Sequence, residues 1–179
     1  TGSATVDATT GLITAISSGT VNLTASAAGD TDYSAASTTQ MITIGQASQT
    51  LTITSANTMN VDGTLTATVM TTATGGRGGA ITFAITSGTG SATVDATTGL
   101  ITAISSGTVN LTASAAGDMD YSAASTTQMI TIGQASQTLT ITSANTMNVD
   151  GTLTATVMTT ATSGRGGAIT FAITSGTGS

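Results

Sequence analysis

Residues 99–118, GLITAISSGTVNLTASAAGD, decide the fold predicted for this chain. Two runs rich in Ile, Leu, Val and Thr alternate apolar with polar residues, and the tripeptide 105–107, Ser-Ser-Gly, separates them. Alternation with a period of two is typical of half-buried β-strands, and Ser and Gly are typical of turns. We therefore predict two strands folded back on each other, the second with Val109, Leu111 and Ala113 facing a core.

The same letters occur at residues 11–30, so the chain repeats with a period of 88 residues. Residues 1–91 superpose on residues 89–179 almost without change. A period of this length predicts a tandem array whose unit has the size of an immunoglobulin domain. The two mismatches are Thr31 against Met119 and Gly75 against Ser163.

Further runs with a period of two occur throughout the 179 residues, and no helical spacing is sustained, so we predict an all-β chain. Asp7 and Gly11, and Asp95 and Gly99 after them, predict a turn between two of these strands. In the repeat unit the predicted strands are residues 51–55, 65–71, 80–87, 93–95, 100–104, 109–115 and 128–132.

Short strands about ten residues apart are typical of a two-sheet sandwich. We predict an immunoglobulin-like β-sandwich, repeated in tandem, with one complete repeat at residues 46–133. Residues 1–45 are then the C-terminal half of one repeat and residues 134–179 the N-terminal half of the next. In the core, the inward side of 109–113 is expected to pack against Leu65, Ala67 and Val69.

The composition excludes several classes of function. The chain has no Cys, His, Lys or Glu, so it offers no disulfide, no transition-metal site, and neither a catalytic triad nor a nucleophile paired with a base. Eight Asp and two Arg give a net charge of −6. Nucleic acids and anionic membranes require clustered basic residues, and no apolar run is long enough to span a bilayer. We expect a protein that is not an enzyme.

The stretch TGSATVDATTGLITAISSGTVNLTASAAGDTDY, followed by AASTTQMITI, resembles the bacterial immunoglobulin-like repeats (invasin and intimin type, group 2) of large surface adhesins. The resemblance implies an extracellular, non-catalytic β-sandwich stacked into a stalk at a bacterial cell surface, and it implies no shared ligand. The matching positions, which recur 88 residues earlier, are Val94, Asp95, Thr98, Gly99, Gly107, Thr108, Val109, Ala116, Gly117, Asp118 and Tyr121.

Four Asp residues are candidate calcium ligands: Asp30, Asp32, Asp118 and Asp120. Calcium takes six to eight oxygen ligands, and interdomain calcium occurs among repeat adhesins. The alternative is an Asx turn that leads into Tyr121, whose hydroxyl would hold the corner of the sandwich. No other cofactor is expected.

Arg77 and Arg165 are the only cations, and each lies in a glycine-rich segment. Such an arginine can pair with an Asp of the adjoining repeat and set the angle between repeats. The alternative is a solvated loop charge that contributes about 0–1 kcal/mol.

The expected function is that of a structural module in a stalk, adhesin or filament, since near-identical copies favour selection on length. The alternative is a ligand-binding adhesin module, with the rows of Thr at 50–54 and 64–68 contacting a glycan, ice or another surface. The expected partners are neighbouring identical repeats, either in the same chain or head to tail between chains, because the two end halves are complementary.

Overall fold

The structure is a computed structural model that describes residues 2–86, 88–162 and 164–176. These residues form strands and no helix, which confirms the all-β prediction, and none of them forms a helix able to cross a membrane. Contacts divide the chain into two units, Thr1–Gly133 and Gln134–Ser179. Ser87, the predicted end of one strand, lies outside the described residues. Residue 163 and residues 1 and 177–179, at the ends of the two predicted half repeats, also lie outside them.

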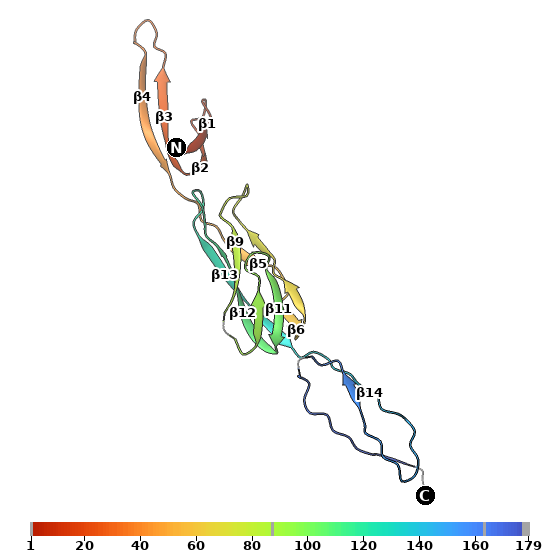
Figure 1. Ribbon diagram of the computed structural model, residues 1–179. Coiled ribbons are helices and arrows are strands. Elements are labelled where there is room, and N and C mark those ends of the chain that lie inside the picture. The colour runs from red at the N-terminus through yellow and green to blue at the C-terminus, as the bar shows by residue number, and fades with distance from the viewer. Residues whose placement is uncertain (1, 87, 163, 177–179) are drawn as a thin grey trace. The chain divides into compact units, whose positions relative to one another are not determined.

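A four-stranded sheet forms one layer of residues 46–133, and β13, β12 and β9 run side by side in it (Figure 1). Strand β12 pairs antiparallel with β13 and with β9, whereas β13 pairs parallel with β6. The bounds are β6 (Thr58–Asn60), β9 (Ile81–Thr86), β12 (Gly107–Ala115) and β13 (Ala124–Gly133).

The remaining strands of residues 46–133 form a three-stranded sheet in the order β10-β11-β7 and a separate pair, β5 with β8. The prediction of a single strand over 65–71 was wrong. The structure has two short strands there, because the chain pairs with β11 before Ala67 and with β5 after it. The short strand β6 was not predicted at all. The bounds are β5 (Leu51–Ile53), β7 (Thr64–Thr66), β8 (Val69–Thr71), β10 (Ser91–Val94) and β11 (Leu100–Ser105).

The strands predicted to fold back on each other, β11 and β12, lie in different sheets, so that prediction was wrong. A single residue, Ser106, separates them, whereas the shortest common hairpin loops have two residues. Gly107 has φ 133, and a Cβ there would collide with the backbone of Gly90. The chain therefore crosses from one sheet to the other at this glycine, and β12 forms its hairpin with β13.

The core lies between the two sheets, and both contribute to it. Ile101 of β11 and Leu111 of β12 are each 0% exposed, and Ala67 lies in the same cluster. The inward side of β12 is confirmed, and Leu65 packs against the cluster as expected, whereas Val69 is not part of it. The buried members are Ala67, Ile101, Ala103, Val109, Leu111, Ile130 and Ile132.

The end segments repeat the local pairing of residues 46–133, shifted by 88 positions. The pair β1–β2 has the register of β10–β11, including its irregularity, and β3–β4 has that of β12–β13. In the second unit, β14–β15 has the register of β5–β8. The bounds are β1 (Ser3–Val6), β2 (Ile13–Ser17), β3 (Gly19–Ala27), β4 (Ala36–Ile44), β14 (Leu139–Ile141) and β15 (Val157–Thr159).

The predicted turn after β1 and after β10 is confirmed. Asp7 Oδ1 accepts the N–H groups of Thr9 and Thr10, at 2.9 and 2.8 Å. Asp95 does the same 88 residues later, and the closing glycine has positive φ in both copies. These hydrogen bonds lower the pKa of both carboxyl groups.

Candidate functional site

The candidate site lies where residues 1–45 meet the sandwich at 46–133, and we call it the junction. The segment that follows β4, which includes Gln46 and Ala47, is hydrogen-bonded to the loop between β12 and β13. Ala47 donates its N–H to Asp120 O at 2.8 Å and accepts from the N–H of Ser122 at 3.0 Å. Gln46 Nε2 donates to Asp118 O at 2.6 Å. The chain is therefore held by the module as it enters it.

Asp118 organises the loop of the junction. Its Oδ1 accepts the N–H groups of Asp120 and Tyr121, each at 2.8 Å, which is an Asx turn. Its Oδ2 accepts the N–H of Gly78 at 2.6 Å, from the loop between β8 and β9. The Gly78 hydrogen bond is the main cause that lowers the pKa of Asp118. This carboxylate thus joins two loops of the same module.

Asp120 reaches the preceding segment. Its Oδ1 accepts the N–H of Ser18 at 2.7 Å, and its Oδ2 lies 3.1 Å from Nη1 of Arg77. Ser18 is 9% exposed, and its Oγ donates to Met119 O at 2.5 Å. The Ser18 hydrogen bond, followed by that of Arg77, lowers the pKa of the Asp120 carboxyl group. One carboxylate therefore links the module to a main-chain N–H of the preceding segment.

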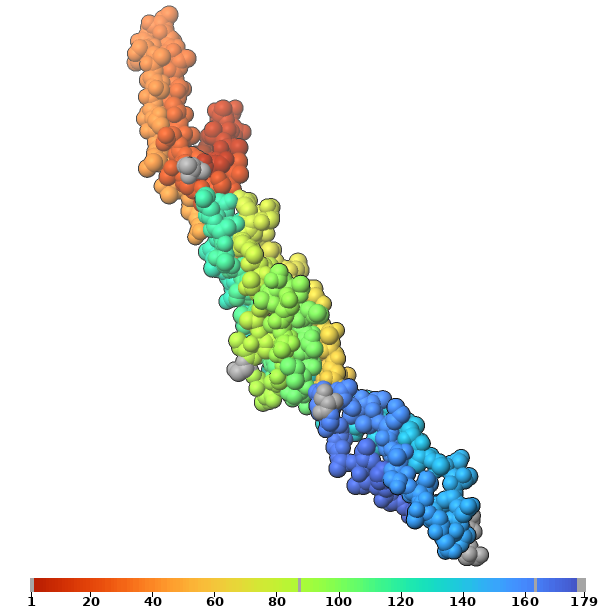
Figure 2. All heavy atoms as spheres, in the orientation of Figure 1, coloured from red at the N-terminus to blue at the C-terminus, as the bar shows by residue number. Residues whose placement is uncertain are grey.

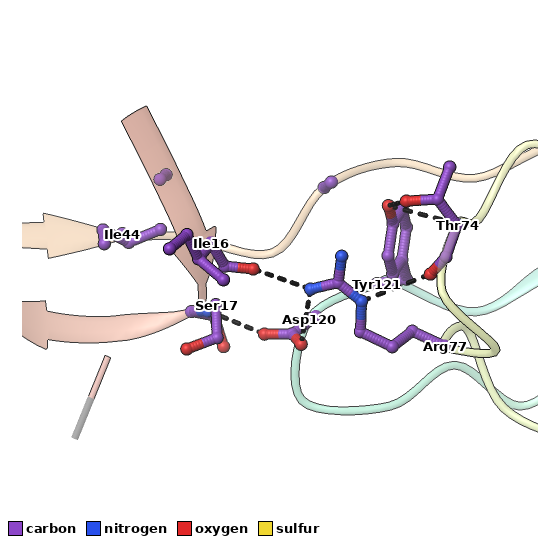
Figure 3. A pocket seen from close by; sticks show the side chains of 11 residues that line it. Ile16, Ser17, Ile44, Thr74, Arg77, Asp120 and Tyr121 are labelled. Carbon is purple, nitrogen blue, oxygen red and sulfur yellow. Dashed lines mark hydrogen bonds and ion pairs between the residues drawn. The ribbon is translucent and has the colours of Figure 1, made fainter. Parts of the chain in front are cut away.

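Arg77 makes the second link to the preceding segment (Figure 3). Nη1 donates to Ile16 O at 2.6 Å, and Nε donates to Thr74 O at 3.2 Å within its own loop. The guanidinium carbon lies 5.6 Å from the centre of the Tyr121 ring, at cation–π distance. The Tyr121 hydroxyl is 3.2 Å from Thr74 Oγ1. Thr74 and the Tyr121 ring therefore hold the Arg77 side chain in the position from which it binds Ile16 O.

Gln49 connects the loops of the junction, and no pattern in the sequence singles it out. This side chain is 7% exposed. Its Nε2 donates to Gly78 O at 2.7 Å and to Ser122 O at 2.8 Å, and its Oε1 accepts from Thr71 Oγ1 at 3.2 Å. The amide thus bridges the loop that carries Arg77 and the loop that carries Asp120. Gly78, with φ 94, leaves room for it, because a Cβ there would collide with the amide.

A cleft of about 280 Å³ opens beside these contacts, lined on one side by Ile16 and Ile44 and on the other by Arg77, Asp120 and Tyr121. The one arginine and the one carboxylate that face it are paired with each other. Ser18 also lines the cleft beside Asp120, and its hydroxyl donates to Met119 O. The charged groups that face the cleft therefore hold the two segments together.

Asp30 and Arg165 each bond to residues of their own loop. Asp30 Oδ1 accepts the N–H groups of Asp32 and Tyr33, at 2.9 and 2.8 Å, and Tyr33 is 79% exposed. In the second unit, Arg165 donates from Nε to Thr162 O and from Nη2 to Thr162 Oγ1.

The four predicted calcium ligands lie in two separate loops, Asp30 and Asp32 between β3 and β4, and Asp118 and Asp120 between β12 and β13. Among the residues that the structure describes, no three acidic groups lie close enough to hold a metal ion. All four carboxylate oxygens of Asp118 and Asp120 accept hydrogen bonds from the protein, and the cation that faces Asp120 is a guanidinium. The Asx turn that leads into Tyr121, the alternative to calcium, is present.

Comparison with known proteins adds no family assignment. No protein-family model matches the chain, and no curated protein matches it.

We expect the bonds that Asp120 accepts from the Ser18 N–H and from Arg77 to weaken as the pH falls below about 4. The pKa of Asp120 is lower in the folded protein than its ordinary value of 3.8, so its contribution is complete above that value and is lost as the pH falls through the lowered pKa. The amide resonance of Ser18, followed by NMR against pH, should report this change. In the variant Asp120→Asn the Ser18 resonance should not titrate, and a transition that survives there would assign it to another group.

Proposed function

We propose that this chain is part of a tandem array of immunoglobulin-like modules that extends a distal domain from a bacterial cell surface or builds a fibre. The strand order of residues 46–133 supports the immunoglobulin-like assignment. The series β5-β8, continued by β7-β11-β10, corresponds to an ABED sheet in which β8 and β7 are two parts of strand B. The series β13-β12-β9 corresponds to strands G, F and C, and β6 adds the second part of strand A beside G.

The observation that carries the proposal is the pair of bonds across the junction. Arg77 and Asp120 of one repeat bind Ile16 O and Ser18 N–H of the repeat before it. Both acceptor and donor are main-chain atoms at the end of β2, so their position follows from the backbone of the preceding module. Hydrogen bonds between a charged side chain and a main-chain atom are directional, so these two bonds fix how the end of β2 meets the next module. A fixed angle at each junction is what an extender requires.

The near-identity of the copies supports the same function. Modules that bind different ligands diverge at their contact residues, whereas the two copies here differ at only two of the compared positions. In an array, each unit contacts mainly its neighbours, so reach increases with copy number. The resemblance to repeats of bacterial surface adhesins is the basis for proposing an extracellular location.

We expect chains lengthened by one, two and three 88-residue repeats to grow linearly in maximum dimension. Strands of up to ten residues rise about 3.3 Å per residue, so each repeat should add on the order of 3–4 nm. Small-angle X-ray scattering on the series measures this increment. The control series carries Arg77→Ala and the same change in every copy, and it should have the same mass with a broader distribution of lengths. A particle that becomes thicker rather than longer would contradict the extender.

A ligand-binding adhesin module is the alternative, favoured by rows of hydroxyl groups on exposed strand faces. Thr54 and Thr68 pair through their Oγ1 atoms at 2.9 Å, and Thr24 and Thr39 do so at 3.0 Å. Such rows offer methyl and hydroxyl groups to a glycan, ice or another surface. Glycan-array binding or ice affinity of the chain, abolished by replacing one row with Val, would favour this alternative over the extender.

A further inference from the structure

Two methionines, Met70 and Met129, occupy outward positions on the strands of residues 46–133. Met70 lies in the middle of β8 and is 67% exposed, and Met129 lies in β13 and is 58% exposed. Their counterparts in the other copies, Met158 and Met41, are 68% and 66% exposed. Because the exposure is nearly the same in every copy, it is a property of these strand positions and does not depend on which strands pack behind them.

The core beneath these positions is built from side chains that resist oxidation. The buried members of the core cluster are Leu, Ile, Val and Ala. The chain has no Cys, Trp or His, so its thioethers are the groups that peroxides oxidise most readily. On the face seen in the space-filling view, the atoms of residues 46–133 (yellow to green) form a closed surface (Figure 2). An oxidant that meets the sandwich therefore encounters the outward methionines first.

A polar residue lies beside each of the two methionines on the same strand face. Met129 is opposite Asn110 of β12, and Met70 is opposite Thr52 of β5. Residues directly opposite each other in an antiparallel pair have neighbouring side chains. A methionine sulfoxide is polar, and amide and hydroxyl groups can donate hydrogen bonds to its oxygen. Oxidation at these two positions therefore adds a polar group to a polar surface and leaves the core unchanged.

Met59 provides the contrast within the same module. Its side chain is partly buried, it pairs with Ile132, and it packs against the core cluster. A sulfoxide at this position would bring a polar oxygen against apolar side chains, which costs free energy unless the oxygen is hydrogen-bonded. The same chemical change is therefore harmless at the two outward positions and destabilising at Met59.

We propose that Met70 and Met129 form an oxidation site on the surface of the repeat, where oxidants of the peroxide class are consumed while the sandwich stays folded. The sulfur lone pair attacks one oxygen of hydrogen peroxide, an S–O bond forms and the O–O bond breaks. Sulfur gives up one electron pair and is oxidised to the sulfoxide. The other oxygen is reduced and leaves as water, after taking up the proton of the transferred oxygen. Methionine sulfoxide reductases restore the thioether.

This proposal goes beyond the proposed function and needs only the sandwich at residues 46–133. It holds whether or not the chain is an extender. If the modules do form an array, each added repeat brings one more pair of outward methionines, so the capacity to consume oxidant increases with copy number.

Treatment of the full chain with hydrogen peroxide tests the order of oxidation. Trypsin cleavage after Arg77 and Arg165 separates the copies, so fragmentation of the peptides in a mass spectrometer assigns each added oxygen to one methionine. We expect Met70 and Met129 to be oxidised several-fold faster than Met59, because oxidation follows exposure.

The repeats supply matched controls for these rates. Met158 and Met41 have the same neighbours in sequence as Met70 and Met129 and nearly the same exposure, so each should be oxidised at the rate of its counterpart. Equal rates within each pair would show that the strand position sets the reactivity.

Thermal melting followed by circular dichroism tests whether the sandwich tolerates the change. The melting temperature should stay constant while the outward methionines are oxidised and should fall only when Met59 reacts. The double variant Met70→Leu, Met129→Leu keeps apolar side chains of similar volume, so it should melt like the parent chain but take up fewer oxygen atoms. The variant Met59→Leu should lose the late fall in melting temperature.

Three results would overturn the proposal: oxidation of Met59 as fast as that of Met70 and Met129, a melting temperature that falls with the first oxygen atoms added, or a double variant that takes up as much oxygen as the parent chain. A length series that failed would contradict the extender and would leave the order of oxidation unaffected.

Discussion

Replacing Leu111 with alanine is expected to lower the free energy of unfolding of residues 46–133 by about 2–5 kcal/mol. Leu111 is 0% exposed and lies in the middle of β12, which pairs with a strand on each side. The substitution removes buried methyl groups and leaves a cavity between the two sheets. Because small domains are stable by only about 5–15 kcal/mol, a loss of this size should be plain in urea unfolding followed by circular dichroism.

The chain contains its own control for this substitution. Leu23 has the same neighbours in sequence and the same position on its strand, but it is only partly buried. We therefore expect Leu23→Ala to have a much smaller effect on the free energy of unfolding. Equal losses in the two variants would show that the core of residues 46–133 is not what stabilises the chain.

The period of two in the sequence predicted which residues of β12 face the core but not which strand pairs with β12. Residues 107–115 alternate as expected, and Val109 and Leu111 are buried. An alternating pattern carries no information on the partner, because strands of both sheets have one inward face. The pairing of β11 with β12 was therefore predicted from their adjacency alone, and the short connection at Ser106 and the positive φ of Gly107 prevent it. Strand β6, with one apolar residue, gave too little pattern to detect.

The sequence predicted the charged residues of the candidate site but not the atoms that they bind. Arg77, Asp118 and Asp120 stand out in a chain with so few charges, and Tyr121 stands out as an aromatic residue. Their partners, such as Ile16 O, are main-chain atoms, and the sequence carries no signal for such atoms. The calcium hypothesis arose because two nearby carboxylates suit a cation as well as they suit backbone N–H groups.

Gln49 is the clearest case of a residue that the sequence did not single out, because it stands among many other uncharged polar residues. We expect Gln49→Ala to lower the free energy of unfolding by roughly 2–4 kcal/mol. The change leaves the buried carbonyl group of Gly78 and the part-buried carbonyl group of Ser122 without this donor, and each such loss costs about 1–3 kcal/mol. The same change should disorder the two loops that carry Arg77 and Asp120. Urea unfolding measures the first effect, and a shift of the Ser18 amide resonance in NMR spectra measures the second.

Gln137→Ala is the matched control, because Gln137 lies 88 residues later in the same local sequence and is exposed. Its Nε2 donates to Gly166 O at 2.8 Å, so the change removes one solvent-exposed hydrogen bond and should alter the free energy of unfolding by less than about 0.5 kcal/mol. A loss in Gln49→Ala no larger than in Gln137→Ala would mean that the amide does not hold the loops. A large loss of unfolding free energy in Gln49→Ala with an unshifted Ser18 resonance would show that Gln49 stabilises the module without setting the geometry of the junction. In that case the Asx turn of Asp118 and the ring of Tyr121 would be enough to hold Arg77 and Asp120 in place.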